Sequence, residues 1–259
     1  MIVAGCDIGS LSAKAVILKD GEILTYQVIR AKSRPEESAR EVMEDVLERS
    51  DISFDSIDYC VGTGYGRNQI PFADAVESEI ACHGRGVIWL VPSIRMVLDI
   101  GGQDAKAIRL DEAGNVIRYA YNDKCASGTG RFIEIMAEAL GVALEDMGEI
   151  SAQAEEPVTI SNQCVVFAET EIISLINEGR KLPDIVGGLH RAMAHRVASL
   201  AKGIELEEDI SFTGGVAKNR GMFSALEEAL GVTIKSPGVD PQITGALGAA
   251  LFASEAVAL

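Results

Sequence analysis

DIGSLSAKAVIL at residues 7–18 and DIGGQDAKAIRL at residues 99–110 are two copies of one segment, with seven of twelve positions identical. In each copy an apolar strand runs into an Asp-Ile-Gly turn and returns as a second strand. A hairpin turn follows, at Asp20-Gly21 and at Glu112–Asn115. We interpret the repeat as an internal duplication of a strand–strand–strand–helix unit. It predicts an α/β fold whose two halves face each other across a cleft, with one Asp-Ile-Gly turn from each half lining it.

Hydrophobic periodicity and turn residues predict the remaining elements. Further strands are expected at residues 23–30, 57–63 and 210–213, and helices at residues 35–49, 74–87, 131–140, 165–177, 182–202, 218–230 and 245–259. The last helix is rich in alanine, and its small residues permit close packing. We assign residues 1–92 and the helix at 245–259 to the first half, and residues 93–244 to the second.

The composition argues against several classes of protein. A chain of 259 residues suffices for one large domain or two smaller ones, and a hydrophobic fraction of 47% is typical of globular proteins. The net charge of −16 argues against nucleic acid or an anionic membrane surface as partner. No apolar run reaches the roughly 20 residues that cross a bilayer, and residues 1–8 are interpreted as a strand, not a signal peptide. Five irregularly spaced cysteines do not resemble a secreted disulfide framework, so we expect a reducing cytoplasm.

The paired Asp-Ile-Gly turns carry the strongest chemical signal. A glycine turn after a strand can surround a phosphate with backbone N–H groups, and an acid beside it can hold Mg²⁺. Two plain hairpin turns are the competing interpretation, but two copies together with Gly214-Gly215 favour a nucleotide clamped at its β- and γ-phosphates. The Walker pattern is absent from the sequence, so this is not a P-loop. We expect Asp7 and Asp99 near magnesium and, around the phosphates, Gly9, Ser10, Leu11, Ser12, Ala13, Lys14, Gly101, Gly102 and Gln103.

The two turns differ at one place. Gln103 and Asp104 stand in the second turn where the first has Leu11 and Ser12. We expect the group that orients the attacking water there, and we name both residues as catalytic candidates beside the two turn aspartates. The alternative is that both are only polar turn residues.

A third glycine turn, Thr213–Ala217, lies between a strand and a helix. It would let a flat base and a ribose approach the backbone, although the motif alone is weak. The further nucleotide contacts that we expect from this turn and its surroundings, and from the glycine turn after residue 125, are Gly214, Gly215, Val216, Asn219, Gln242, Gly128 and Gly130.

Two of the cysteines stand shortly before helices. Cys125 lies at the mouth of a glycine-rich turn that leads into residues 131–140, and Cys164 ends Ser161–Cys164, directly before residues 165–177. Backbone N–H groups and the helix dipole favour negative charge at a helix N-terminus. The pattern therefore suggests two thiolate ligands.

The other cysteines have simpler interpretations. Cys6 and Cys60 lie in apolar strands and are expected to be small buried residues. For Cys82-His83, packing with a satisfied histidine is preferred to a metal site. The turn Thr63–Arg67 has a glycine-shaped sequence, but its role does not follow from the residues.

Several of these motifs together resemble those of a known superfamily. The Asp-Ile-Gly turns and the late Thr-Gly-Gly turn look like the phosphate and adenosine motifs of the actin, Hsp70, acetate kinase and sugar kinase superfamily, which has a duplicated, ribonuclease H-like fold. A closer match is to the ATP-dependent activators of 2-hydroxyacyl-CoA dehydratases, the BadF/BadG/BcrA/BcrD type. That family includes ATPase subunits of benzoyl-CoA reductase and reductases of double-cubane-cluster proteins. The matching segments are Asp99–Asp104, Asn122–Arg131, Cys164–Glu171, Thr213–Ala217 and Gly245–Leu251.

The resemblance implies a homodimer that binds ATP or ADP with Mg²⁺ and holds one [4Fe–4S] cluster at the subunit interface. Such a cluster usually takes four thiolates, and a two-fold axis would double the pair formed by Cys125 and Cys164. The implied activity is ATP-driven delivery of one electron to an iron–sulfur partner, either a dehydratase, a benzoyl-CoA reductase-like enzyme or a double-cubane-cluster protein. A ferredoxin or flavodoxin would be the upstream donor.

Two other functions remain as alternatives. One is a small-molecule kinase of the same superfamily, although no residue stands out as a substrate base and the cysteine turns would have no function. The other is a non-enzymatic ATP-dependent scaffold. Lys14 resembles the lysine of the family's first phosphate turn, whereas its repeat partner Lys106 is interpreted as a charge at a strand edge.

Overall fold

The computed structural model describes residues 1–161 and 164–258. Asn162 and Gln163, in the segment before Cys164, and Leu259, in the predicted last helix, lie outside the described residues. Two compact units make up the chain. The first contains residues 1–97, 108–118 and 236–259, and the second contains residues 98–107 and 119–235.

The first unit is built on a five-stranded sheet with the order β3-β2-β1-β4-β5. Strands β1 and β2 are antiparallel, as are β2 and β3, whereas β4 is parallel to β1 and β5 is parallel to β4. Register places Asp7 opposite Lys14, at the end where β1 turns into β2. The strands are β1 (Ile2–Ile8), β2 (Ser12–Lys19), β3 (Glu22–Arg30), β4 (Tyr59–Thr63) and β5 (Ala75–Val76).

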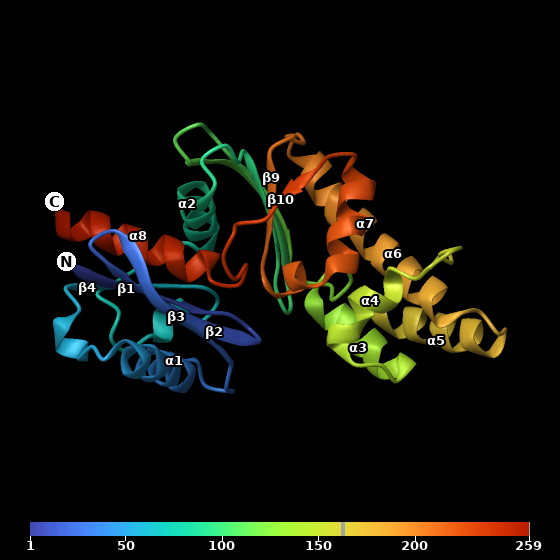
Figure 1. Ribbon diagram of the computed structural model, residues 1–259, viewed down its shortest axis with the longest axis horizontal. Helices are drawn as coiled ribbons and strands as arrows, with labels where there is room; N and C mark the ends of the chain where they lie inside the picture. Colours follow the sequence, from blue (N-terminus) through green and yellow to red (C-terminus); the bar gives the residue numbers. More distant parts are fainter. Residues whose placement is uncertain (162–163, 259) are drawn as a thin grey trace. The chain divides into compact units, whose positions relative to one another are not determined.

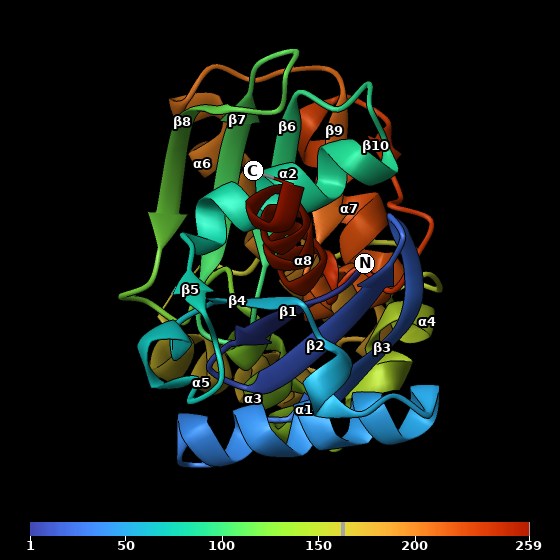
Figure 2. The ribbon, with the colours of Figure 1, turned by 90° about the vertical axis from the view of Figure 1, so that its left-hand side faces the viewer.

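Helices cover both faces of this sheet, as Figures 1 and 2 show. Helix α1 (Pro35–Ser50) packs on one face, and α8 (Thr244–Ala258) packs on the other, beside α2 (Glu79–Leu90). Because side chains alternate along a strand, β1 sends Ala4 to the cluster under α1 and Val3 to the cluster under α8. The long apolar strands of the sequence are therefore buried on two sides.

Glycines let α8 approach its neighbours backbone to backbone. A Cβ on Gly5 of β1 would lie 2.0 Å from the carbonyl oxygen of Ala246, and one on Gly248 would lie 1.8 Å from that of Cys82. A Cβ on Gly86 of α2 would lie 2.1 Å from the carbonyl oxygen of Thr244. The close packing predicted for the small residues of the last helix is confirmed.

The second sheet repeats the first. Its order is β10-β9-β6-β7-β8, which matches the first sheet strand by strand when β6 is placed on β1 and β9 on β4. The duplication predicted from the repeated segment is thus present in the topology. The strands are β6 (Met96–Ile100), β7 (Ala105–Leu110), β8 (Val116–Asn122), β9 (Ile210–Thr213) and β10 (Ile234–Lys235).

In the described part of the second unit there are five α-helices. Helix α6 packs against α7 and α4, and α3 packs against α5. Among residues 1–161 and 164–258, no helix is long and apolar enough to cross a membrane. The helices are α3 (Gly130–Leu140), α4 (Met147–Ser151), α5 (Val165–Asn177), α6 (Leu182–Gly203) and α7 (Arg220–Leu230).

Two predicted helix starts are wrong. The helix expected from residue 74 begins at Glu79, because Asp74 joins the backbone of Cys60 in both directions and Ala75–Val76 pairs as a strand with β4. The helix expected from residue 218 begins at Arg220. There Asn219 forms the N-cap, since its side chain accepts a hydrogen bond from the backbone nitrogen of Met222.

Candidate functional site

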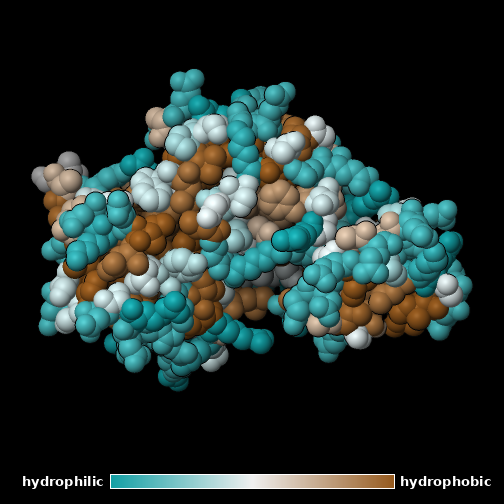
Figure 3. Space-filling view, in the orientation of Figure 1, coloured by the Kyte–Doolittle hydropathy of each residue, from teal (hydrophilic) through white to brown (hydrophobic). Residues whose placement is uncertain are grey.

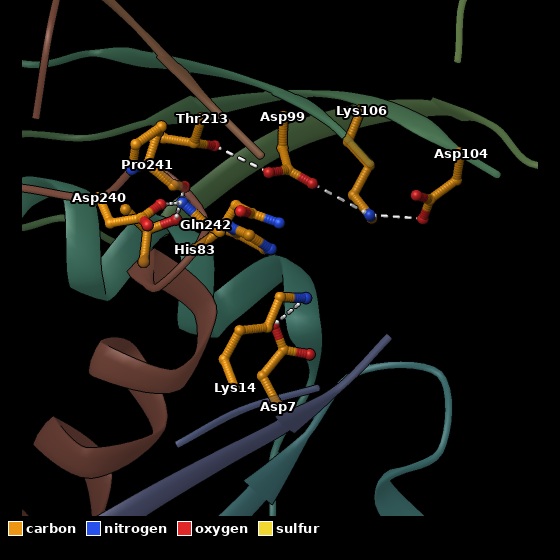
Figure 4. Close-up of polar contacts among 11 residues, drawn as sticks. Asp7, Lys14, His83, Asp99, Asp104, Lys106, Thr213, Asp240, Pro241 and Gln242 are labelled. Carbon is orange, nitrogen blue, oxygen red and sulfur yellow. Dashed lines mark hydrogen bonds and ion pairs between the residues drawn. The ribbon is translucent and has the colours of Figure 1, made fainter. Parts of the chain in front are cut away.

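The first Asp-Ile-Gly turn holds a nearly buried ion pair. Nζ of Lys14 lies 3.2 Å from Oδ2 of Asp7, and the two side chains are 11% and 6% exposed. The backbone nitrogen of Gly9 donates to the carbonyl oxygen of Ser12 at 3.0 Å and closes the turn. Figure 4 shows the pair at the end of β1 and β2. A carboxylate and a lysine held beside a glycine turn suit a magnesium-bound phosphate.

Two other segments of the first unit border the Asp7 carboxylate. A Cβ on Gly64, whose φ is +87°, would lie 2.3 Å from Oδ1. A Cβ on Gly245, at the start of α8, would lie 2.9 Å from Oδ2 and 3.2 Å from Nε2 of His83. Nδ1 of His83 is in turn 3.1 Å from Oγ1 of Thr244. Only glycine fits at either position without moving the acid.

The second Asp-Ile-Gly turn contains the same kind of acid–lysine pair and one additional acid, Asp104. Nζ of Lys106 lies 3.3 Å from Oδ2 of Asp99 and 2.5 Å from Oδ2 of Asp104. Oγ1 of Thr213 donates to Oδ1 of Asp99 at 2.9 Å. Figure 4 shows this row of four side chains. The interpretation of Lys106 as a strand-edge charge is therefore wrong: the side chain is buried because it joins two carboxylates.

The duplication extends to a second pair of turns. Gly214 follows Thr213 with a φ of +86°, and a Cβ there would lie 2.3 Å from the carbonyl oxygen of Ile100 and 3.0 Å from Oδ1 of Asp99. Gly64 follows Thr63 in the same conformation against Asp7. The turn Thr63–Arg67 is thus the first unit's counterpart of Thr213–Ala217. A Thr-Gly pair after a strand in each half is the sequence signal that could have found it.

One contact breaks the symmetry between the two turns. Thr213 donates its hydroxyl to the acid of its own unit, whereas Oγ1 of Thr63 donates to the carbonyl oxygen of Glu77 at 3.1 Å. The polar neighbour at the Asp7 turn is His83 instead, which sequence analysis left as a packing residue. His83 is buried with 6% exposure.

The second turn is hydrogen bonded to the start of α3. The backbone nitrogen of Gly130 donates to the carbonyl oxygen of Gly101, and that of Arg131 donates to the carbonyl oxygen of Gly102, both at 2.8 Å. The turn itself is closed by a bond from the nitrogen of Gly101 to the carbonyl oxygen of Asp104 at 2.9 Å. A displacement of the backbone of the second acidic turn would therefore be transmitted to the start of α3 through these two hydrogen bonds.

The loop that carries Cys125 is held by side chains. Nδ2 of Asn122 donates to the carbonyl oxygens of Cys125 and Ser127, both at 2.8 Å. Gly128 has a φ of +86° and packs against the side chain of Arg196. Cys125 is half-buried, and exposed Cys164 stands at the N-cap of α5. Both cysteines belong to the second unit, and the helices that they precede pack against each other.

The remaining three cysteines are buried, which confirms the prediction for Cys6 and Cys60. Burial raises the pKa of Cys60 and of Cys82 to about 12, and it raises that of Cys6 well above its ordinary value. These side chains are thiols at neutral pH. Only a thiolate is a good metal ligand, so Cys125 and Cys164 are the accessible candidates.

The residues predicted to contact the base and ribose lie in two turns, one in each unit. Gly215 and Val216 lie in a 3-10 turn after β9, and Asn219 ends it. Nδ2 of Asn219 lies 3.2 Å from Nε2 of His190, while Oδ1 caps α7, so the carboxamide is fixed at both ends. Gln242, in the first unit, donates its backbone N–H to Oδ1 of Asp240 at 3.0 Å. Their contact with a nucleotide stays a prediction, as does the water-orienting role of Gln103.

Comparison with known proteins assigns the family. Residues 4–253 match the BadF/BadG/BcrA/BcrD ATPase family. The activator of lactoyl-CoA dehydratase from Anaerotignum propionicum is 46% identical over 258 residues, which cover 99% of this chain and 98% of that protein. The chain belongs to the BadF/BadG/BcrA/BcrD ATPase family, as its motifs predicted.

Solved structures confirm the fold. The activator of 2-hydroxyisocaproyl-CoA dehydratase from Clostridium difficile, with bound ADPNP, matches with a TM-score of 0.95 at 41% identity and covers 100% of this chain and 96% of that one. A ROK family glucokinase from Streptomyces griseus, in complex with glucose and AMPPNP, matches with a TM-score of 0.58 at 13% identity, covering 98% and 100%. That second likeness shows the fold alone. The expected duplicated fold of the actin, Hsp70 and sugar kinase type is correct.

Proposed function

We propose that this protein is an ATP-hydrolysing activator that passes one low-potential electron to a 2-hydroxyacyl-CoA dehydratase. The observation that carries the proposal is the backbone connection between the second acidic turn and α3, the helix that follows Cys125. It joins a site suited to nucleotide phosphates to a site suited to a metal cluster within one unit. Relatives that are named as activators of dehydratases supply the class of partner.

The nucleotide end of the proposal uses the two acid–lysine pairs. Carboxylate oxygens are the ligands that Mg²⁺ prefers, and Asp7 and Asp99 are each held in place by a lysine, of which Lys106 is buried and Lys14 largely so. In this proposal bound Mg²⁺ would neutralise phosphate charge at these turns. Lys14 and Lys106 hold the two carboxylates in place beside the turns. Gln103, next to Asp104 in the second turn, orients the attacking water.

The cluster end uses the two accessible cysteines. One chain offers Cys125 and Cys164, and a second copy related by a two-fold axis offers the same pair, which completes the four thiolates of a [4Fe–4S] cluster. Both thiolates stand shortly before helices whose N-terminal N–H groups favour negative charge. When bound, the cluster supplies a one-electron carrier that a ferredoxin or flavodoxin reduces.

An apolar face beside Cys164 supports the homodimer. Helix α5 exposes Val166 and Phe167 at 66% and 62%, followed by Ile173 and Ile176 at 48% and 44%. Figure 3 shows apolar residues gathered over this region. Large exposed apolar side chains are costly in water, and a second copy of the same face would cover them.

Delivery of a low-potential electron needs more energy than ligand binding alone commonly supplies, which explains why it would be coupled to ATP hydrolysis. For a one-electron step about 59 mV corresponds to about 1.4 kcal/mol, so lowering a potential by roughly 300 mV costs about 7 kcal/mol. Ligand-driven coupling commonly supplies only about 1–3 kcal/mol. Hydrolysis at the acidic turns therefore has to be linked mechanically to the cysteine loop, and the bonds from α3 to Gly101 and Gly102 provide such a link.

Anaerobic purification tests the proposal. The protein should be brown, sediment as a dimer and contain four irons per dimer, and Cys125→Ser and Cys164→Ser should each remove the iron. Cys60→Ala, which changes a buried cysteine, is the matched control and should keep it. ATP hydrolysis with iron-free wild-type protein and no electron transfer to a dehydratase from the native host would reject the electron carrier and favour a kinase or a scaffold.

A further inference from the structure

We propose that His190 is a positioning residue of the turn at residues 214–219, which it holds in the shape that receives the adenosine part of a nucleotide. This inference rests on the proposed function, because it requires ATP to bind with its base and ribose at this turn. It concerns a buried histidine of α6 that neither the acidic turns nor the cysteine loop uses.

Asn219 is the residue that fastens this turn to the rest of the second unit. Its backbone nitrogen donates to the carbonyl oxygen of Val216 at 2.9 Å, and its carbonyl oxygen accepts from the nitrogen of Phe223 at 3.1 Å. Its Oδ1 accepts from the nitrogen of Met222 at 3.1 Å, and its Nδ2 lies 3.2 Å from Nε2 of His190. The turn, α7 and α6 therefore meet at one side chain.

The carboxamide of Asn219 defines the role of each nitrogen of the His190 ring. Since Oδ1 accepts from a backbone N–H, the group that faces the ring is the amide nitrogen, which can only donate. Nε2 is therefore the acceptor, and the proton of the neutral ring lies on Nδ1. Burial lowers the pKa of His190 to about 4, so the ring is neutral at neutral pH.

Close backbone contacts fix both side chains. His190 is 1% exposed. A Cβ on Gly221 of α7 would lie 2.5 Å from Nδ1 of His190, and a Cβ on Gly148 of α4 would lie 3.0 Å from Oδ1 of Asn219. The ring therefore packs directly against the backbone of α7, and the connection from α6 to the turn is rigid.

The histidine is kept at a cost to stability. Among residues 1–161 and 164–258, the buried Nδ1 of His190 has no hydrogen-bond partner. A buried donor without a partner destabilises a folded protein, and an apolar side chain of similar size would avoid that penalty. The contact that requires a polar side chain here is the one to Asn219. This contrast assigns His190 to the placement of the turn.

Two substitutions break the connection from its opposite ends. His190→Leu fills the space of the ring and removes the acceptor, whereas Asn219→Ser keeps an N-cap oxygen for α7 but is too short to reach α6. His190→Gln is the conservative variant, because its side-chain oxygen reaches the place of Nε2 and can accept from Asn219. The exposed His195→Gln on α6 is the matched control.

The experiment compares two ligands in the presence of Mg²⁺. ADPNP carries base, ribose and phosphates, whereas inorganic tripolyphosphate carries only the phosphate chain. Binding of ADPNP is measured by titration calorimetry, and binding of tripolyphosphate is measured by its displacement of ADPNP. Unfolding temperatures are recorded for each variant.

We expect His190→Leu and Asn219→Ser each to lower the affinity for ADPNP about tenfold, close to the value of one hydrogen bond, and the double variant to lose no more than either alone. Affinity for tripolyphosphate should change less than about twofold, because a loosened turn weakens only the part of the ligand that touches it. His190→Gln should stay within about threefold of wild type for both ligands, since the acceptor is restored.

Unchanged ADPNP affinity in His190→Leu, equal losses for the two ligands, or additive losses in the double variant would each overturn the inference. A loss in His190→Gln as large as that in His190→Leu, or wild-type protein that binds ADPNP no more tightly than tripolyphosphate, would overturn it too. If wild-type protein binds neither ligand with Mg²⁺, the proposed function fails instead.

Discussion

The backbone nitrogen of Gly130 donates to the carbonyl oxygen of Gly101 at 2.8 Å, so α3 starts on the second acidic turn. A Cβ on Gly130 would lie 3.0 Å from that same oxygen, so a larger residue there would push the turn by a few tenths of an ångström. Because Cys125 lies just before α3, the turn that we assign to phosphate and the loop that we assign to the cluster cannot move independently.

Asp99→Asn should abolish ATP hydrolysis and leave the iron in place. The amide keeps the shape of the carboxylate but removes the charge that we assign to magnesium, and losses of about 10²–10³ in rate are typical when one electrostatic contact to a reacting group is removed. Hydrolysis of ATP and iron content are measured on the same preparation.

Glu112→Gln, in the exposed hairpin that follows the second copy of the repeat, is the control for Asp99→Asn because it removes one negative charge outside the acidic turn. Undiminished hydrolysis in Asp99→Asn would contradict the assignment. Loss of iron with loss of hydrolysis would instead point to unfolding of the α3 connection.

Alanine at Gly64 or Gly214 should destabilise the protein by about 1–3 kcal/mol, the usual cost of forcing a side chain into a glycine-only conformation, with the clash against Asp7 or Asp99 in addition. Gly21→Ala separates the two causes. Its φ of +85° is similar, but nothing lies within 4 Å of the added Cβ. Equal losses of the free energy of unfolding in denaturant at all three positions would mean that the contacts with the acids contribute nothing.

Phe167→Glu should weaken the dimer of iron-free protein, because it buries a charge in the apolar face of α5 that we assign to the second copy. Sedimentation at several concentrations measures the effect. Leu24→Glu, at another exposed apolar residue in the first unit, should leave association unchanged. A dimer that tolerates Phe167→Glu would place the interface elsewhere.

Alkylation should divide the cysteines of iron-free protein into two groups. At pH 8 Cys125 and Cys164 should react with iodoacetamide, and Cys6, Cys60 and Cys82 should not, since they are buried and the pKa of Cys60 and Cys82 is raised to about 12. Raising the pH to 9 leaves these two thiols protonated and should not expose them. Mass spectrometry identifies the sites, and full labelling in denaturant is the control.

His190 should make the protein less stable in mild acid. Burial lowers its pKa to about 4 in the folded protein, against about 6.5 in the unfolded chain, so the unfolded state alone takes up the proton as the pH falls between these values. That penalty is absent above pH 6.5 and reaches about 3 kcal/mol near pH 4.

The acid dependence is read from the free energy of unfolding of wild type and His190→Gln between pH 7 and pH 4. The two curves should converge as the pH falls, because glutamine takes up no proton. His195→Gln, at an exposed histidine on the same helix, is the control for the substitution itself. Parallel curves for wild type and His190→Gln would mean that this ring takes up a proton as readily in the folded protein as in the unfolded chain.

The parts of the fold that follow from local pattern were predictable. The copy of residues 7–18 at 99–110 predicted both acidic turns, and the apolar runs on either side of each turn predicted the strands. The start of α2 was not predictable in the same way, because Ala75–Val76 is a strand only through its pairing with β4. A helix and a short edge strand look alike until the neighbour is known.

The side-chain contacts around the acids depended on residues far apart in the chain. Thr213 is 114 residues from Asp99, and Thr244 is 161 residues from His83. No spacing rule connects such positions. The burial of Lys106 likewise depends on two carboxylates that meet only when the turn is folded. The positions of Cys125 and Cys164 before helices and of the two glycine turns after strands were predictable, because each motif lies within a few residues of a helix start or a strand end.

Helix α8 fills one face of the first sheet with residues that the ribosome adds long after β1. All residues of the second unit, 98–107 and 119–235, are synthesised before Thr244, whereas Val3, Val16 and Val61 lack most of their packing partners until α8 is made. During translation all elements of the second unit are therefore made first. Until α8 is synthesised, the first sheet exposes an apolar face that chaperones can bind. A stalled or truncated chain that stops before Thr244 would leave the older half of the protein unfinished and the younger half folded.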